Sequence, residues 1–147
     1  MKVLVQKVLS ASVKVNEQIV SSINNGLLLF IGIEKNDTTV EADYLVKKIL
    51  NLRIFNDENN KMNLSVQATG GEILAVSQFT LAADLHRGNR PGFDSAALPH
   101  DAELLYEYFV QKLKESEIVV KTGIFQAYMA VSLVNDGPCT FILEKHT

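Results

Sequence analysis

The sequence predicts an α+β fold in which mostly antiparallel, mixed β-sheets form a barrel-like core with two main amphipathic helices. Short β-type runs cluster at both ends of the chain, two segments carry apolar residues at helical spacing, and no βαβα alternation occurs. The 147 residues are 47% hydrophobic and contain no linker-like stretch or internal repeat. We therefore expect one domain over residues 1–147.

The opening segment is rich in β-branched residues and predicts three strands: 2–8, 11–15 and 19–23. The stretches NEQ (16–18) and NNG (24–26) are typical of hairpin turns. The run Leu27–Ile33 follows, and it is apolar without alternation. This pattern predicts a strand that is buried on both faces.

A helix is expected after this strand. Thr38 and Glu41 have the spacing of a capping box, in which hydroxyl and carboxylate satisfy unpaired backbone amides. Apolar residues recur behind it at helical spacing: Val40, Tyr44, Leu45, Ile49 and Leu50. Beyond the helix, 52–55 and 72–81 predict strands with a turn at 56–61.

The second half of the chain begins with a long loop, 82–100, which contains Gly and Pro. A second amphipathic helix is expected from about Asp101 to Glu115, with its apolar face formed by Leu104, Leu105, Tyr108, Phe109 and Leu113. Three closing strands follow at 118–122, 125–134 and 139–144.

The last two strands are separated by Asn135-Asp136-Gly137-Pro138. Asn-Asp-Gly is an ordinary hairpin signal, but proline cannot donate to the ladder of a following strand. The local sequence predicts a hairpin turn with a trans peptide bond before Pro138, because only about 5–6% of X-Pro bonds are cis.

Composition limits the function classes. The net charge of −3 argues against extensive nucleic-acid coating, although a small basic patch could hold one end of an RNA. A lone cysteine, Cys139, excludes an internal disulfide and fits a reducing compartment. The longest apolar run, Leu27–Ile33, is far shorter than the roughly 20 residues of a membrane span. We expect a cytoplasmic protein without a membrane partner.

Cofactor and metal motifs are missing from the sequence. His86, His100 and His146 lack the spacing of metal ligands, and neither a P-loop nor a GxGxxG motif occurs. We therefore expect no cofactor and no metal.

The polar candidates for chemistry lie at the end of strand 72–81. In an extended strand, Ser77 and Phe79 share one face, whereas Gln78 and Thr80 share the other. On the pattern alone, ordinary hydrogen-bonded hydroxyls at a strand end are the better explanation. His86, Arg87 and Arg90 form a basic cluster in the long loop. It is either a solvated loop or a set of phosphate contacts that positions a nucleic acid.

Two motifs in this chain resemble those of the D-aminoacyl-tRNA deacylases. They are Ser-Gln-Phe-Thr at 77–80 and Asn-Asp-Gly-Pro-Cys-Thr at 135–140, and the likeness extends over essentially the whole chain, including RGNRPGF at 87–93. The resemblance implies a homodimeric hydrolase that cleaves the ester between a D-amino acid, or glycine, and the acceptor end of tRNA.

The resemblance also implies roles for individual residues. The Gly137–Pro138 bond would be cis and enter the partner's active site, where two backbone carbonyls hold the substrate ammonium and L side chains are excluded. The pocket is assigned to Ser77, Gln78, Phe79 and Thr80, and the other substrate contacts to Asn135, Gly137, Pro138, Phe125 and Met129. Hydrolysis would be assisted by the ribose 2′-hydroxyl, with Thr80 in a positioning role.

Some positions depart from the family pattern. Lys7 replaces a frequent arginine, so a bidentate contact becomes a point charge, whether that residue braces the Gly-Pro segment or contacts RNA. Arg87 and Arg90 stand in the segment RGNRPGF, which is less basic than the segment that the family resemblance leads us to expect. Two alternatives remain open: a non-catalytic RNA-binding or dimerisation module, and a thiol hydrolase that uses Cys139.

Overall fold

A computed structural model describes all residues, 1–147. Its elements in chain order are β1 (Lys2–Val15), β2 (Gln18–Ile23), β3 (Gly26–Gly32), α1 (Thr39–Asn51), β4 (Phe55–Asn56), β5 (Met62–Leu64), α2 (Val66–Thr69), β6 (Glu72–Ser77), the 3₁₀ helix η1 (Phe79–Ala82), α3 (Pro99–Lys114), β7 (Val120–Thr122) and β8 (Ala130–Glu144). This is the expected α+β class, with a mixed, nearly closed, barrel-like sheet and two main helices.

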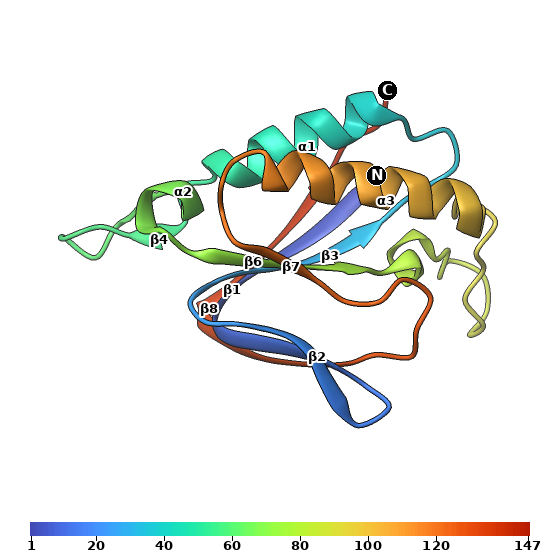
Figure 1. Cartoon of the computed structure of the whole chain (residues 1–147). Helices are drawn as coiled ribbons and strands as arrows, with labels where there is room; N and C mark the ends of the chain where they lie inside the picture. The colour runs from blue at the N-terminus through green and yellow to red at the C-terminus, as the bar shows by residue number, and fades with distance from the viewer.

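The main sheet has the strand order β2-β1-β3-β6-β7, and β8 pairs with the other edge of β1. The pairs β3–β6 and β6–β7 are parallel, whereas β1 pairs antiparallel with β2, β3 and β8. Helices α1 and α3 lie side by side over one face, and the strands curl away from them on the other (Figure 1).

The sheet is buried on both faces, as the run Leu27–Ile33 predicts. Leu27, Leu29 and Ile31 pack toward the helices in the larger core, which includes Phe109. Leu28 points to the opposite face, into a smaller core enclosed by the curled strands. Alternate side chains of one strand thus bind the two layers together.

The two expected helices are present. Thr38 caps α1, and both hydrogen bonds of the capping box with Glu41 are formed. The expected apolar faces are partly wrong, because Val40, Tyr44 and Leu104 are exposed. In α3, Tyr106 and Val110 are buried in addition to Leu105, Phe109 and Leu113. The helix is therefore rotated relative to the face expected from sequence, and it begins at Pro99, two residues before Asp101.

Two pairs of expected strands are each one continuous strand. Segments 2–8 and 11–15 belong to β1, which pairs first with β3 and then with β2. The two residues between them, Leu9 and Ser10, mark the change of partner. Segments 125–134 and 139–144 contribute to the single strand β8, which begins only at Ala130. The hairpin expected at 135–138 is wrong, because both halves of β8 pair with β1.

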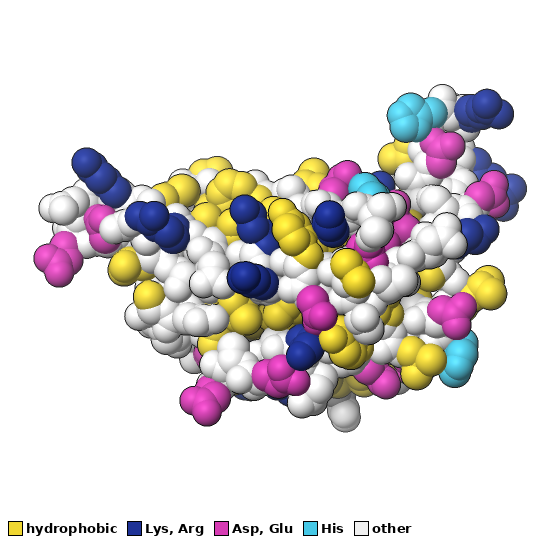
Figure 2. All heavy atoms as spheres, turned by 90° about the horizontal axis from the view of Figure 1, so that it is seen from above, with side chains coloured by type: hydrophobic (Ala, Val, Ile, Leu, Met, Phe, Trp, Pro, Cys, Tyr) yellow, Lys and Arg dark blue, Asp and Glu magenta, His cyan; other side chains and the backbone are white.

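Other strands are shorter than expected. Segment 52–55 is extended only at its end, as β4, and β7 begins at Val120. Strand 72–81 ends at Ser77, where the chain turns into η1. No helix combines the length and apolar character required to cross a bilayer. Figure 2 shows acidic and basic side chains interspersed over the helical face, without one continuous basic stripe on that side.

Candidate active site

A cavity of about 810 Å³ opens at the carboxyl ends of β3 and β6. Its walls come from three further segments: the loop after β3, the loop before α3 and the segment between β7 and β8. The lining is mostly apolar, and its residues used below are Lys35, Ser77, Gln78, Phe79, Phe93, Asp94, Phe125, Tyr128 and Met129. Apolar walls with a few polar groups at strand ends are typical of a small-molecule site.

The polar part of the cavity is formed where β6 ends. The Gln78 backbone N–H donates to the Ile31 carbonyl at 2.8 Å, which holds this strand end against β3. Ser77, Gln78 and Phe79 line the cavity, but Thr80 does not. The Gln78 side-chain amide instead donates to the Thr80 hydroxyl. The alternation expected for an extended strand is wrong here, because Phe79 and Thr80 lie in the 3₁₀ helix η1.

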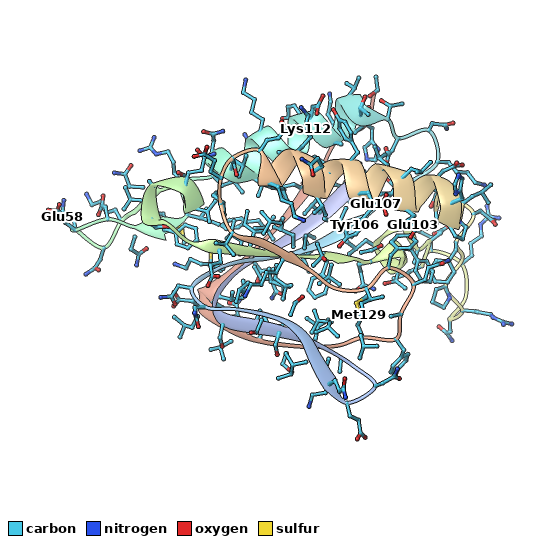
Figure 3. The ribbon with its side chains drawn as sticks, in the orientation of Figure 1. Glu58, Glu103, Tyr106, Glu107, Lys112 and Met129 are labelled. Carbon is cyan, nitrogen blue, oxygen red and sulfur yellow. The ribbon has the colours of Figure 1, made fainter.

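Aromatic and sulfur-containing side chains form the walls. Phe125 and Met129 line the cavity, as does Phe93, whose ring centroid lies 5.1 Å from that of Phe79. In Figure 3, Met129 lies on the side of the sheet away from α3, and Tyr106 points from α3 toward the sheet. The Tyr106 hydroxyl donates to the Ala75 carbonyl at 2.9 Å, and burial raises the pKa of Tyr106 to about 12. Tyr106 therefore supports the strand carrying Ser77 and is not a base at neutral pH.

The lining contains only two charged side chains, Lys35 and Asp94. No histidine or cysteine is among the lining residues, so no nucleophile–base pair of the serine- or cysteine-hydrolase kind is present there. Cys139 is 3% exposed and lies in the larger core, and burial raises the pKa of its thiol. This placement disfavours the thiol-hydrolase alternative, because the reactive species would be the thiolate. The structure contains no cluster of three or more His, Cys, Asp or Glu side chains arranged for a metal.

The Gly137–Pro138 segment lies elsewhere on the chain. Residues 136–139 bulge out of β8 opposite Lys7, because Gln6 pairs with Thr140 while Val8 pairs with Asn135. The peptide bond before Pro138 is cis, as the family resemblance implies and the local sequence does not. Gly137 has φ of +135°, a conformation that L side chains rarely adopt. Both residues are exposed.

The side chain of Asn135 holds this bulge from both ends. Its carbonyl oxygen accepts from the Cys139 backbone N–H at 2.8 Å. Its amide nitrogen donates to the Cys139 carbonyl and the Thr140 hydroxyl, both at 3.1 Å. Asn135 thus orders the backbone of the Gly-Pro segment without contacting the cavity.

Lys7 lies beneath the same bulge. It is 5% exposed, and its ammonium is 3.9 Å from the Asp136 carboxylate and 5.9 Å from the centroid of the Phe55 ring. These contacts within the chain fit a bracing role better than an RNA contact. Arg87 and Arg90, in contrast, are exposed on the long loop and are outside the cavity lining.

The two expected parts of the site are separated within one chain. Lys7 pairs with Leu27 on β3, and Leu27 pairs with Ile73 on β6. From Ile73 to Ser77 is about 13 Å along an extended strand, and three strand spacings from β8 to β6 add about 14 Å across the sheet. Gly137, Pro138 and Asn135 are accordingly not among the residues that line the cavity.

Several lining residues were not singled out from the sequence, namely Lys35, Phe93, Asp94, Leu98 and Tyr128. Phe93 and Asp94 stand in the loop 82–100, whose length indicated a functional segment without indicating which side chains face inward. Tyr128 is 96% exposed, a property that only the structure shows, and no pattern in the sequence singled it out.

Comparison with known proteins gives consistent matches over the whole length. The family model described as D-Tyr-tRNA(Tyr) deacylase matches residues 4–144. A D-aminoacyl-tRNA deacylase of Geotalea uraniireducens is 58% identical over 144 residues, covering 98% of this chain and 93% of that protein. One from Pelobacter propionicus is 52% identical over 145 residues, covering 99% and 100%.

A solved structure agrees with these matches. The structure of a c-Myc DNA unwinding element binding protein is 42% identical, covers 100% of both chains and superposes with a TM-score of 0.94. The fold, the strand-end cavity, the two motifs and the full-length matches together show that the chain belongs to the D-Tyr-tRNA(Tyr) deacylase family of hydrolases.

Proposed function

We propose that this protein hydrolyses the ester bond of D-aminoacyl-tRNA at the cavity beside Ser77, Gln78 and Phe79, and that it rejects L-aminoacyl-tRNA. Family membership supports the reaction, and the cavity supports the place. Its apolar walls suit an amino-acid side chain and a nucleoside, whereas its polar strand end suits an ester. The observation that carries the assignment is this strand end, which bears the family's Ser-Gln-Phe-Thr motif.

The chemistry we propose depends on backbone groups and on the substrate. η1 begins at Phe79, and the first backbone N–H groups of a helix have no intrahelical acceptors. Such amides can stabilise the oxyanion of an ester undergoing attack, a contribution of about 3 kcal/mol per donor. Lys35 and Asp94 are the only charged side chains in the lining, and no histidine or cysteine is among the lining residues. We therefore assign activation of water to the neighbouring ribose 2′-hydroxyl and leave Thr80 a positioning role.

We further propose that the working unit is a homodimer in which Gly137–Pro138 enters the partner's cavity. The separation of the two motifs within one chain supports this arrangement. Strand β8 is paired only with β1, so its second edge is unpaired. Exposed apolar side chains also gather on β1 and β8, namely Leu9, Val134, Phe141 and Ile142. Unpaired edges and exposed apolar groups are typical of surfaces that associate.

Chiral selection follows from this arrangement by exclusion. Backbone carbonyls of the partner's Gly-Pro segment, ordered by Asn135, would hold the substrate α-ammonium while the strand end holds the ester. With both groups fixed, an L side chain would point into the wall, whereas a D side chain would point into the cavity. Glycine has no side chain to exclude, so glycyl-tRNA is also expected to be cleaved.

The test compares hydrolysis of D-tyrosyl-tRNA, L-tyrosyl-tRNA and glycyl-tRNA by the purified protein. We expect rapid cleavage of the D ester and of glycyl-tRNA, with the L ester left intact. Equal rates for the D and L esters would refute chiral selection. Binding of tRNA without cleavage would favour the non-catalytic RNA-binding module. Resistance of glycyl-tRNA would refute exclusion while leaving the hydrolase in place.

A further inference from the structure

Lys35 is the only cationic side chain that lines the cavity. It lies in the loop between β3 and α1 and lines the cavity together with the end of β6. Lys35 is exposed, and its ammonium is not within 4.0 Å of any carboxylate in the structure. An unpaired cation at the mouth of an apolar cavity is available for an anionic group of a ligand.

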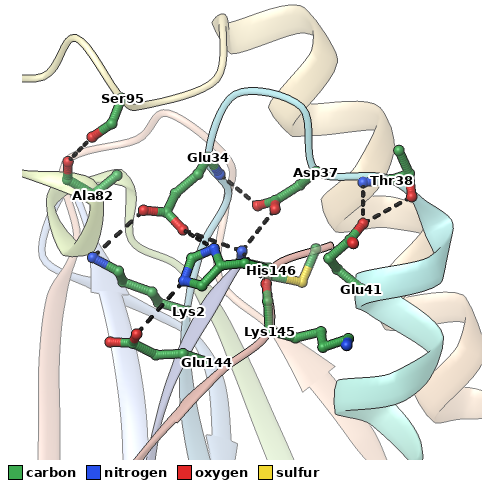
Figure 4. Close-up of polar contacts among 11 residues, drawn as sticks. Lys2, Glu34, Asp37, Thr38, Glu41, Ala82, Ser95, Glu144, Lys145 and His146 are labelled. Carbon is green, nitrogen blue, oxygen red and sulfur yellow. Dashed lines mark hydrogen bonds and ion pairs between the residues drawn. The ribbon is translucent and has the colours of Figure 1, made fainter.

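Lys35 is unpaired although acidic residues flank it, because both carboxylates are engaged by other cations. The Met1 α-ammonium lies 3.2 Å from the Glu34 carboxylate and 2.7 Å from that of Asp37. Lys2 lies 3.5 Å from the second oxygen of Glu34, and His146 approaches the same carboxylate at 3.5 Å. Figure 4 shows Lys2 and His146 directed at the Glu34 carboxylate, beside Asp37.

The backbone of Lys35 is fixed while its side chain is free. Its N–H donates to the Ser95 carbonyl at 2.9 Å, and the neighbouring Glu34 forms a bridge with Ala96. The Ser95 hydroxyl in turn donates to the Ala82 carbonyl at 2.6 Å, which joins this loop to the end of η1. The point from which the lysine side chain extends is therefore held relative to the polar strand end.

Chain length limits how far Lys35 lies from that strand end. The Ile31 carbonyl accepts from Gln78 at 2.8 Å, so Ile31 lies level with the proposed ester site. Lys35 is four residues beyond Ile31, and the two Cα atoms are at most about 14 Å apart. This limit leaves room for a nucleoside between the ester and the ammonium, and the flexible lysine side chain can adjust to the length of the ligand.

We propose that Lys35 binds the phosphate on the 5′ side of the terminal adenosine and so positions the aminoacyl end of the RNA. This inference rests on the proposed function. The ester would lie at Ser77–Phe79. Along the RNA from the ester, this phosphate would be the first negatively charged group outside the cavity. A lysine contact of this kind contributes charge and position without reading base identity. Arg87 and Arg90 are outside the cavity lining, so they would contact more distant parts of the RNA.

The first experiment compares wild type, Lys35→Ala, Lys35→Arg and Lys61→Ala on D-tyrosyl-tRNA. Lys61 is an exposed lysine remote from the cavity lining and serves as the matched control. We expect Lys35→Ala to raise KM about tenfold at constant kcat and to lower the salt dependence of binding by about one phosphate. Lys35→Arg should retain most of the affinity, and Lys61→Ala should behave as wild type. All variants should unfold at the wild-type denaturant midpoint. An unchanged KM in Lys35→Ala would overturn the proposal.

The second experiment identifies the phosphate. The substrates are adenosine and adenosine 5′-monophosphate, each esterified with D-tyrosine on the ribose. Wild type should favour the phosphorylated ester about tenfold in KM, and Lys35→Ala should abolish that preference without affecting the other ester. If Lys35→Ala weakens both esters equally, the phosphate assignment is refuted while the deacylase remains. If wild type cleaves neither these esters nor D-tyrosyl-tRNA, the proposed function fails, and this inference fails with it.

Discussion

The hydrogen bonds of Asn135 make the Gly137–Pro138 segment testable by one substitution. Asn135→Ala removes three hydrogen bonds and leaves the backbone N–H of buried Cys139 without its acceptor. A hydrogen bond contributes about 1 kcal/mol net, and an unsatisfied buried donor costs about 1–3 kcal/mol. Allowing for partial replacement by water, we expect the free energy of unfolding to fall by about 2–4 kcal/mol. The free energy of unfolding of a typical domain is about 5–15 kcal/mol, so the variant should still fold.

The assay combines equilibrium unfolding in urea with the ratio of kcat/KM for D- and L-tyrosyl-tRNA. We expect Asn135→Ala to lose both stability and chiral discrimination, because a disordered Gly-Pro segment can no longer hold the α-ammonium. Ser132→Ala is the control, since Ser132 is exposed on the same strand and should change stability by less than about 0.5 kcal/mol. Wild-type stability in Asn135→Ala would refute the structural role. Lost stability with intact discrimination would refute the link between this segment and selection.

Three further substitutions test the fold and the chemistry. Hydrogen bonds from the Thr38 side chain and backbone lower the pKa of Glu41, so its contribution to stability is present above an unfolded pKa of about 4.3 and is lost as pH falls. Glu41→Gln should therefore cost about 1 kcal/mol at pH 7 and flatten the acid limb of the stability profile below about pH 4, and an unchanged limb would contradict this. Gly26→Ala should prevent folding, because its Cβ would collide with the Glu72 carbonyl, and a soluble variant with a wild-type circular dichroism spectrum would show that the strands can separate. Cys139→Ala should cost about 1 kcal/mol of stability and leave the deacylation rate within about twofold of the wild-type rate. Loss of activity in a folded variant would instead support the thiol mechanism.

Local rules predicted those features of the fold that depend on neighbouring residues. The capping box at Thr38 and Glu41 and the two-sided burial of Leu27–Ile33 require only short-range pattern. Strand continuity was not predictable in this way. Residues 135–138 have a local preference for a hairpin turn. Both flanking segments nevertheless pair with β1, and a bulge accommodates the extra residues. The face of α3 was misplaced because Tyr106 satisfies its hydroxyl on Ala75, a contact between residues 31 positions apart.

The residues of the candidate site were even less predictable from local sequence patterns than the fold. Ser77, Gln78 and Phe79 were found because the motif is contiguous. Lys35, Phe93 and Tyr128 come from three separate loops, and only the folded chain brings them to one cavity. The separation of Gly137 from Ser77 also depends on strand register, which no local pattern specifies.

In the dimer that we propose, each active site combines the cavity of one subunit with the Gly-Pro segment of the other. The most direct test pairs two variants, Ser77→Tyr to fill the cavity and Gly137→Val to alter the exposed segment. Each variant alone should be inactive on D-tyrosyl-tRNA. A mixed dimer, isolated with two different tags, contains one site that is wild type in both parts, so it should recover about half of the wild-type activity. A mixed dimer as inactive as its parents, or an active wild-type monomer, would contradict an active site shared between subunits.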